Sequence, residues 1–197
     1  MGKIFYIFGK SSTGKDTIYK NLMENKELGL RPIIPYTTRP MRAKETPGVE
    51  YHFTDEEELA QMEAAGKVIE LRSYETVHGI WKYFTAAGKH IDLEHYHYAM
   101  IGVLASFLAV RKYYGEDKVI PVYIEVEDGE RLQRALDRER SQEQPKYAEL
   151  CRRFLTDNAD FAEEKLLQAN IGQRFTNTNL QDCIQQITAY IQKQMEM

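Results

Sequence analysis

Hydrophobic and polar positions along the chain predict strands and helices in alternation. An apolar run at 3–8 predicts a buried strand, and the spacing of Ile18, Leu22 and Met23 predicts a helix at about 14–25. The alternation continues through the rest of the chain, and no long Gly/Ser or Pro-rich linker interrupts it. This order is typical of a mostly parallel sheet with helices on both sides. We therefore expect a single α/β domain.

The middle of the chain shows the pattern of a short helix between two strands. Residues 51–53 predict a strand end, and residues 54–57 provide an N-cap and an acidic first turn for the helix that follows. Gly66 ends this helix, and residues 67–71 predict a short strand. The apolar stretch at 99–110 is interpreted as a buried strand that turns into a helix.

In the C-terminal half, a β-rich run at 119–126 predicts another strand. Pro121 lies inside this run and favours an edge position or a break in the ladder, because proline has no N–H to donate. Asp128 is expected to cap the next helix. Two further helices are predicted, a long one at about 148–168 and a last one at about 180–194.

The loop between the first strand and the first helix carries a phosphate-binding pattern, Gly-x4-Gly-Lys. Its glycines allow backbone N–H groups to turn toward one anion, and the helix N-terminus and Lys15 add positive charge. The pattern is that of a P-loop, and it indicates a nucleoside triphosphate as ligand. The residues expected to bind its phosphates are Gly9, Ser11, Ser12, Thr13, Gly14, Lys15, Asp16 and Thr17.

A second anion-binding pattern lies at 37–53. It contains Arg39 and Arg42, an acid, and Tyr51, interspersed with proline and glycine. Guanidinium groups bind a phosphate dianion in a bidentate way, and a tyrosine hydroxyl adds a neutral donor. By itself the block is equally consistent with a solvated charged loop. Together with the P-loop, it predicts a second anion site facing the first.

Composition restricts the possible partners and location. The net charge of -4 provides no basic field for nucleic acid, and the longest apolar stretch, 99–110, is too short to span a bilayer. Cys151 and Cys183 show no pairing pattern, which favours free thiols in a reducing compartment. We therefore expect a cytoplasmic protein with no nucleic-acid or membrane partner. The sequence leaves the oligomeric state open.

The 37–53 block closely resembles the nucleotide-binding segment of guanylate kinases, with its Thr-Thr-Arg-x-x-Arg-x-x-Glu and Gly-x-x-Tyr-x-Phe pattern. The P-loop position, the strand ending in Glu70, the Arg152-Arg153-Phe154 step and the turn at 176–180 are also similar to this family. The resemblance implies an ATP-dependent kinase that phosphorylates GMP or dGMP. It also implies a P-loop NTPase-type core at 1–32, 89–130 and 154–197. An acceptor-binding region at 33–88 and a lid at 131–153 would be inserted in this core.

The resemblance further implies roles for individual residues, with ATP as donor and Mg²⁺ as cofactor. Arg39, Arg42 and Tyr51 would bind the acceptor's phosphate, with Glu45 orienting the arginines or supporting the metal. Glu70 would accept from N1–H and N2–H of guanine. The implied catalytic set is Lys15, Arg39, Arg42, Arg138 and Arg153; the acceptor-binding set is Thr38, Arg39, Arg42, Glu45, Tyr51, Glu70, Tyr83 and Thr85; and Asn177 would lie beside the ATP.

Three positions depart from the family pattern. Pro35 stands in place of a base-contacting serine, and Asp16 stands in place of the P-loop hydroxyl residue. The strand within 99–104 is expected to end in an aspartate, but the aligned position is about Leu104. Two interpretations of Asp16 remain open: its carboxylate replaces the missing acid near Mg²⁺, or it caps the helix.

Two alternative functions follow from these departures. The same fold could phosphorylate a different nucleotide or a sugar phosphate, because the base-side residues are altered. A guanylate-kinase-like domain could also serve as a non-catalytic binding module. The presence of Lys15, Arg138 and Arg153 argues against the second alternative.

Overall fold

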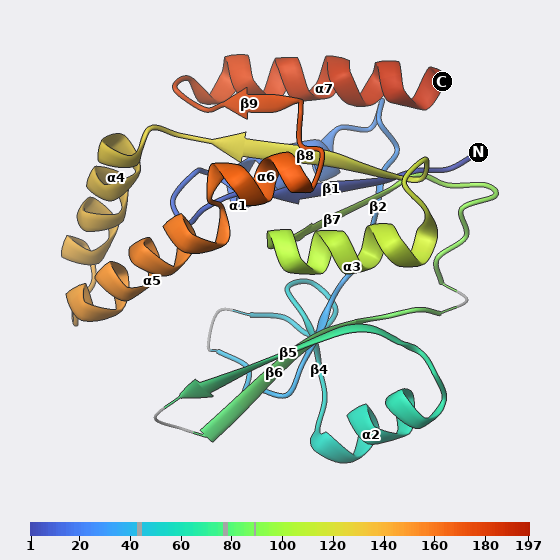
Figure 1. Cartoon of the computed structure of the whole chain (residues 1–197), viewed down its shortest axis with the longest axis horizontal. Helices are drawn as coiled ribbons and strands as arrows, with labels where there is room; N and C mark the ends of the chain where they lie inside the picture. Colours follow the sequence, from blue (N-terminus) through green and yellow to red (C-terminus); the bar gives the residue numbers. More distant parts are fainter. Residues whose placement is uncertain (43–44, 77–78, 89) are drawn as a thin grey trace.

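Two separate sheets organise the chain (Figure 1). The computed structural model describes residues 1–42, 45–76, 79–88 and 90–197. In this part of the chain, five parallel strands form the main sheet in the order β2-β7-β1-β8-β9. Their bounds are β1 (Ile4–Phe8), β2 (Arg31–Pro32), β7 (Tyr98–Gly102), β8 (Val119–Glu125) and β9 (Arg174–Thr176).

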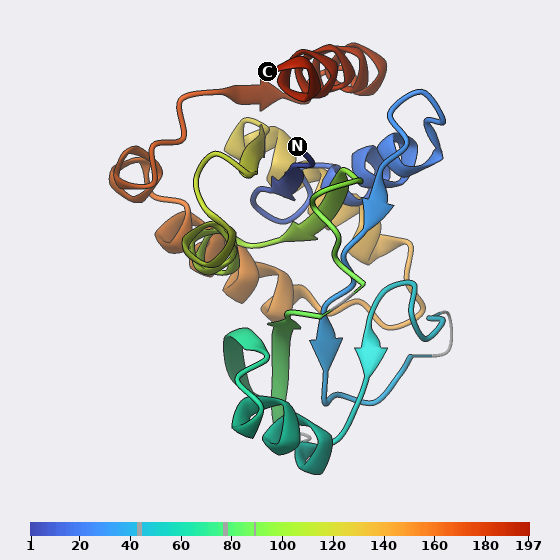
Figure 2. The ribbon, with the colours of Figure 1, turned by 90° about the vertical axis from the view of Figure 1, so that its right-hand side faces the viewer.

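Helices cover both faces of the main sheet, as the sequence predicted (Figure 2). Side chains of β1 alternate between the faces. Phe5 and Ile7 pack against α1 (Lys15–Glu24) and α7 (Leu180–Glu196). Ile4, Tyr6 and Phe8 pack against α3 (Leu104–Tyr114) and α6 (Glu163–Gln168). All five residues of β1 are buried, so this strand is the centre of the core.

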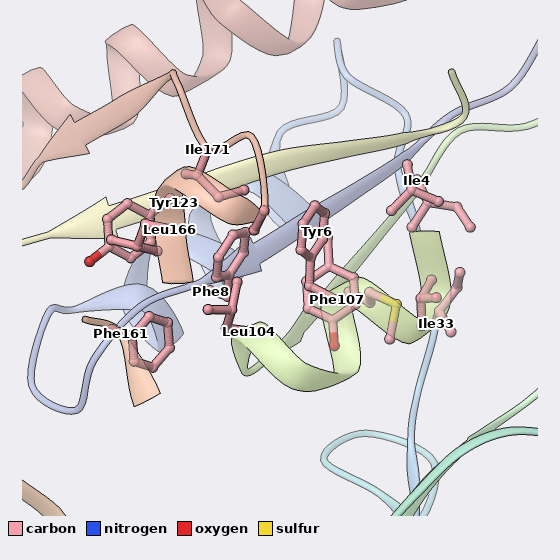
Figure 3. Close-up of a cluster of buried hydrophobic side chains, with 14 of the residues drawn as sticks. Ile4, Tyr6, Phe8, Ile33, Leu104, Phe107, Tyr123, Phe161, Leu166 and Ile171 are labelled. Carbon is pink, nitrogen blue, oxygen red and sulfur yellow. The ribbon is translucent and has the colours of Figure 1, made fainter. Parts of the chain in front are cut away.

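An aromatic cluster supports the end of β1, directly before the P-loop (Figure 3). The ring of Phe8 stacks on Phe107 with centroids 4.8 Å apart, and it also contacts Tyr123 at 5.5 Å and Phe161 at 6.4 Å. Phe8 and Phe107 are fully buried. The loop that follows Phe8 therefore starts from a rigidly packed position.

The second sheet is built within 33–88 and lies below the main sheet in Figure 1. In the described residues its strand order is β4-β3-β6-β5. Helix α2 packs on it through Leu59, which contacts Phe84 and Ala86. Asp55 caps α2 by accepting from the Glu58 N–H, as predicted. The bounds are β3 (Tyr36–Thr37), β4 (His52–Phe53), α2 (Glu56–Ala64), β5 (Val68–Thr76) and β6 (Gly79–Ala86).

The strand predicted at 67–71 is longer than expected. It continues to Thr76 because β5 pairs with β6 along its length, from Val68 opposite Ala86 to Thr76 opposite Gly79. The sequence analysis underestimated this strand because its second half is mostly exposed, at Ser73, Tyr74 and Glu75 in succession, and lacks a continuous apolar run. Residues 43 and 44 of the 37–53 block, and residue 89 at the expected core boundary, lie outside the described residues.

Pro121 lies where the ladder on one side of β8 is interrupted, which is one of the two alternatives predicted for it: β8 lies between β1 and β9, but pairing with β9 begins only at Tyr123, so the proline opposes β1 alone. Two other predictions for the C-terminal half need correction. Helix α4 (Asp128–Arg140) is capped by Glu127, whose side chain accepts from the Glu130 N–H. Asp128 instead forms ion pairs.

The long helix predicted at 148–168 is two helices. Helix α5 (Tyr147–Asp160) ends before Phe161, and Ala162 has an extended backbone with ψ of 143°. Phe161 and Leu166 are both buried in the same cluster, at 4% and 2% exposure. The bend lets both side chains reach the sheet, and tertiary packing therefore overrides the helical periodicity.

We predict that Phe161→Ala lowers the free energy of unfolding by about 3–5 kcal/mol, because it removes a buried ring that packs on Phe8 and Tyr123. Urea denaturation measures this change. The matched control is Leu155→Ala in helix α5. Leu155 is 68% exposed, so we expect its substitution to change the free energy of unfolding by no more than about 0.5 kcal/mol. Equal effects of the two substitutions would contradict the role given to the cluster.

Candidate active site

The P-loop backbone needs glycine at both of its ends. A Cβ at Gly9 would lie 2.2 Å from the carbonyl oxygen of Ile124. Gly14 has a φ of 83°, and a Cβ there would lie 2.6 Å from Nδ2 of Asn177. That amide nitrogen donates to the carbonyl oxygen of Thr13 at 2.8 Å. Asn177, predicted to lie beside the ATP, therefore holds the loop itself.

The loop presents unused polar groups to a ligand. Ser12 has a φ of 63°, a left-handed conformation that is uncommon for residues other than glycine. Its hydroxyl oxygen is buried and has no hydrogen-bond partner among the described residues. A buried polar atom without a partner is costly unless a ligand or water completes it. The loop is therefore shaped for a polar ligand such as phosphate.

Charges of both signs gather around Lys15 at the start of α1. Burial lowers the pKa of Lys15, the carboxylates of Asp16 and Asp157 act to raise it, and the guanidinium groups of Arg153 and Arg138 act to lower it. The structure thus brings the two arginines predicted from the lid into the electrostatic neighbourhood of the P-loop lysine. This is the arrangement expected of a site for a highly charged anion.

Helix α5 contacts the P-loop directly. The Ser11 N–H donates to Oδ2 of Asp157 at 2.7 Å, and Nη2 of Arg153 donates to the Ser11 hydroxyl at 3.1 Å. Lys10 donates from Nζ to Asn158 at 2.8 Å. The Asp157 carboxylate thus accepts a hydrogen bond from one backbone N–H of the loop.

Arg131 on α4 completes this network, and it was missed by the sequence analysis. It is 1% exposed and donates to Asp128 at 3.0 Å, to Asn158 at 2.9 Å and to the carbonyl oxygen of Ser11 at 3.3 Å. The spacing of Asp128 and Arg131, one helical turn apart, was a visible signal for their pair. The contacts with α5 and the loop depend on the tertiary structure.

In the second sheet, Arg39 and Glu45 form a buried ion pair. Nη1 of Arg39 donates to Oε2 at 2.7 Å and Nη2 donates to Oε1 at 2.5 Å, and Arg39 is only 3% exposed. The Arg42 N–H also donates to Glu45, at 2.9 Å, while residue Arg42 itself is exposed. Nε of Arg39 is buried without a partner among the described residues. The geometry places Glu45 as the group that orients Arg39.

Tyrosines line the same region. The Arg39 guanidinium lies 5.0 Å from the centre of the Tyr51 ring, and the rings of Tyr51 and Tyr83 are 5.6 Å apart. Burial raises the pKa of Tyr51, so its hydroxyl stays protonated and can donate. The Thr38 hydroxyl accepts from the Lys82 N–H at 3.1 Å, which joins β6 to the residue directly after β3.

Glu70 and Thr85 face one another across β5 and β6. The Thr85 hydroxyl donates to Oε1 of Glu70 at 2.9 Å. Arg72, which the sequence analysis did not single out, donates from Nε to Oε2 at 2.8 Å. The Glu70 side chain is 6% exposed. The structure thus brings Glu70 and Thr85 together as expected, and it adds an arginine to them.

The structure shows the surroundings of two positions that depart from the family pattern, the end of β7 and Asp16. Strand β7 ends at Gly102, two residues before Leu104, which is the first residue of α3. A Cβ at Gly102 would lie 2.2 Å from the Tyr6 hydroxyl oxygen, so no carboxylate fits there. Asp16 is exposed in the first turn of α1, and the N-cap is Gly14 without a side-chain hydrogen bond. Capping by Asp16 through a hydrogen bond is therefore wrong.

Comparisons with known proteins agree with this geometry. Residues 1–194 match the sequence model of the family described as "Guanylate kinase". The chain belongs to the guanylate kinase family. Among curated members, the guanylate kinase of Porphyromonas gingivalis is 28% identical over 191 residues and is covered over 95% of each chain, and that of Symbiobacterium thermophilum is 35% identical over 98 residues, 47% of this chain and 46% of its own.

The fold of the family is also found here. The crystal structure of guanylate kinase from Anaplasma phagocytophilum superposes with a TM-score of 0.63, at 18% identity, covering 98% of this chain and 85% of that one. This similarity supports the mixed α/β architecture with a parallel central sheet. In the described residues, no helix combines the length and apolar character needed to cross a membrane.

We predict that Glu45 makes the stability of this kinase fold depend on acid pH. The hydrogen bonds from Arg39, together with the Arg42 amide, lower the pKa of Glu45 from 4.5 to about 2. Because the folded-state value is depressed, the stabilisation is present above about pH 4.5 and is lost as the pH falls toward 2. Urea unfolding at a series of pH values should show a smaller loss in Glu45→Gln than in the wild type.

The control for this experiment is Glu143→Gln, because Glu143 is exposed and lies outside the second sheet. Its acid-induced loss of stability should match that of the wild type. If Glu45→Gln and the wild type lose stability in parallel over this pH range, the ion pair does not contribute as described.

Proposed function

We propose that this protein transfers the γ-phosphoryl group of ATP to GMP or dGMP, in the manner of the family to which it belongs. The observation that carries the proposal is that one fold holds two separate groups of cationic residues, each of which would bind an anion. One is the P-loop with Lys15, and the other is the Arg39–Glu45 pair of the second sheet. A phosphotransferase needs both, because donor and acceptor each bring phosphate charge.

On the donor side, the loop amides and Lys15 would hold the ATP phosphates, as the orphaned Ser12 hydroxyl supports. The residues proposed for this site are Gly9, Ser11, Ser12, Thr13, Gly14, Lys15, Asp16 and Thr17. Asn177 would hold this loop through its hydrogen bond to the Thr13 carbonyl oxygen. An exposed carboxylate directly after Lys15 is a hard oxygen donor of the kind Mg²⁺ prefers. Asp16 would thus contribute to holding Mg²⁺, which supplies charge neutralisation to the bound phosphates.

On the acceptor side, Arg39, Arg42 and Tyr51 would bind the phosphate of the nucleoside monophosphate. Arg39 is already oriented by Glu45, so little side-chain entropy is lost on binding. The exposed Arg42 is free to approach the same phosphate. Glu70 and Thr85 would read the base, with Tyr83 beside Tyr51 closing the pocket.

The chemistry itself needs no general base, because the attacking phosphate oxygen is already ionised. Catalysis would consist of positioning and charge neutralisation by the chain's own cations. Arg138 and Arg153 would close over the transferred group; the contact of Arg153 with the Ser11 hydroxyl at 3.1 Å and the effect of both charges on the pKa of Lys15 support this role. Closure of the proposed lid at 131–153 would exclude water and so prevent hydrolysis of ATP.

The proposal extends to organisation and location. We assign 33–88 as the acceptor-binding region and the rest, apart from the lid, as the core. The free thiols of Cys151 and Cys183 support the cytoplasm as location. Family membership and the retained cations favour this kinase over a non-catalytic module or a kinase for another phosphorylated acceptor.

We predict that Lys15→Ala and Arg39→Ala each lower kcat/KM for phosphoryl transfer from ATP to GMP by about a hundredfold or more, because each removes a charge that binds the phosphates in the transition state. A coupled assay of ADP release measures this, and circular dichroism verifies the fold. Lys20→Ala is the control, because Lys20 is exposed and pairs with Glu24 on the helix surface. Near-normal rates in both site variants would rule out the mechanism.

We predict that Asp16→Ser shifts the Mg²⁺ concentration needed for half-maximal turnover, because a neutral hydroxyl replaces a charged ligand group. Turnover with saturating ATP and GMP is measured over a Mg²⁺ titration. Asp182→Ser is the control, since Asp182 is likewise an exposed acid in the first turn of a helix, α7, but does not belong to the proposed phosphate-binding residues. An unchanged Mg²⁺ dependence in Asp16→Ser would show that Asp16 does not take part in holding the ion.

A further inference from the structure

The carboxylate of Glu70 is already engaged in the structure. Oε1 accepts from the Thr85 hydroxyl at 2.9 Å and from Nη2 of Arg72 at 3.3 Å, and Oε2 accepts from Nε of Arg72 at 2.8 Å. A carboxylate offers roughly four acceptor positions, two on each oxygen. Oε1 is therefore saturated, and Oε2 retains room for one further donor. Glu70 in this state accepts one N–H of a base and not two.

Arg72 has unused donors at the same place. Nε–H and one N–H of Nη2 point to Glu70, and the remaining N–H groups have no hydrogen-bond partner among the described residues and are not buried. Arg72 also lines a cavity of about 610 Å³ that lies between β5, α3 and α6. Burial alone would lower the pKa of Arg72, but the Glu70 carboxylate outweighs it and raises this pKa, so the group stays charged.

The strand register places Arg72 on the face that carries the other base-side residues. Glu70 lies opposite Thr85, and Arg72 lies opposite Tyr83, one pleat further along β5 and β6. Residues two apart on a strand share a face. Pro35 directly precedes Tyr36, which pairs with Phe84, so Pro35 falls in the row of Thr85 and Glu70. Pro35 brings no side-chain donor to this row, whereas Arg72 brings several.

The pair of Arg72 and Glu70 offers a donor next to an acceptor. The Watson–Crick edge of guanine presents the O6 acceptor next to the N1–H donor, which is the complementary order. Adenine presents the reverse, a 6-amino donor next to the N1 acceptor, and would place donor against donor and acceptor against acceptor. Arginine is also the side chain most often found on guanine oxygens in specific complexes.

We propose that Arg72 is a specificity-determining residue of the acceptor site, which donates to the 6-oxo group of the purine while Glu70 accepts from N1–H. This inference rests on the proposed function. Arg72 then selects a 6-oxopurine nucleotide over a 6-aminopurine nucleotide. Glu70 accepts one hydrogen bond from the base and not two.

The test compares Arg72→Met with the wild type on four acceptors, GMP, 6-thio-GMP, IMP and AMP. 6-Thio-GMP keeps N1–H and the 2-amino group and weakens only the acceptor at position 6. The wild type should prefer GMP over 6-thio-GMP in kcat/KM by about tenfold or more, and Arg72→Met should lose most of this preference. The change should appear chiefly in KM, with a parallel loss of GMP binding by calorimetry.

The other acceptors separate base reading from a structural role. The ratio of GMP to IMP reports the 2-amino group, and it should not fall in Arg72→Met, because the acceptor positions that Arg72 vacates on Glu70 become available to N2–H. The ratio of GMP to AMP should fall in Arg72→Met, because the donor that repels the 6-amino group is gone. Arg72→Lys, which keeps a charged donor, should recover part of the GMP preference.

Arg111→Met is the matched control. Arg111 is also a partly buried arginine, which donates to the carbonyl oxygen of Ala169 at 2.7 Å and pairs with Glu116, away from the second sheet. It should lose stability without any change in the acceptor ratios. If Arg72→Met does not fold because Glu70 is left unpaired, Glu70→Met combined with Arg72→Met removes both charges and should likewise show no preference for GMP over 6-thio-GMP.

The outcomes distinguish this inference from the proposed function. A wild-type protein that phosphorylates GMP, with a GMP preference over 6-thio-GMP that survives in Arg72→Met or in the double variant, overturns the role of Arg72 and leaves the kinase assignment intact. A wild-type protein that binds ATP but phosphorylates none of the four acceptors overturns the proposed function itself.

Discussion

The conformation of the P-loop is the constraint on which the site depends, and it is imposed by groups distant in sequence. The loop begins at Phe8, whose ring is fixed among Phe107, Tyr123 and Phe161. It ends at Gly14, where the Asn177 amide occupies the space of a side chain and holds the Thr13 carbonyl. Between these two points the backbone adopts a left-handed turn at Ser12. The ring packing of Phe8 and the hydrogen bond from Asn177 therefore keep the N–H groups of the loop oriented before any phosphate binds. Phosphoryl transfer requires this preorganisation.

Three arginines of the described part of the chain are each oriented by neighbouring acids. Arg39 is held by Glu45, Arg72 by Glu70, and Arg131 by Asp128 and Asp157. A charge-assisted bidentate pair fixes the plane of a guanidinium and leaves its outer N–H groups for a ligand. The acids beside the arginines are consequently as important for the site as the arginines themselves, because a buried arginine without its acid would be neither stable nor directed.

Two of the departures from the family pattern concern the end of β7 and the P-loop, and the third, Pro35, lies in the second sheet. The end of β7 lies beside the end of β1, since Phe8 pairs with Gly102, and the Tyr6 hydroxyl donates to Ser106 at 2.6 Å and takes the room that a side chain at Gly102 would need. Asp16 places a carboxylate in the first turn of α1. A change in core packing next to the site and a change of residue type in the P-loop therefore occur together in this chain.

The sequence by itself determined the P-loop, the family and the alternation of strands and helices, because each rests on short-range spacing of glycines, charges and apolar residues. It also brought out Glu45, Tyr51, Glu70 and Thr85, which the family pattern marks. Only the tertiary structure decided the contacts of Arg72, Arg131 and Asp157 and the bend at Phe161 between α5 and α6. These features arise where residues far apart in the chain come into contact. The local spacing of apolar and polar residues does not predict which strand or helix will pack against a given segment.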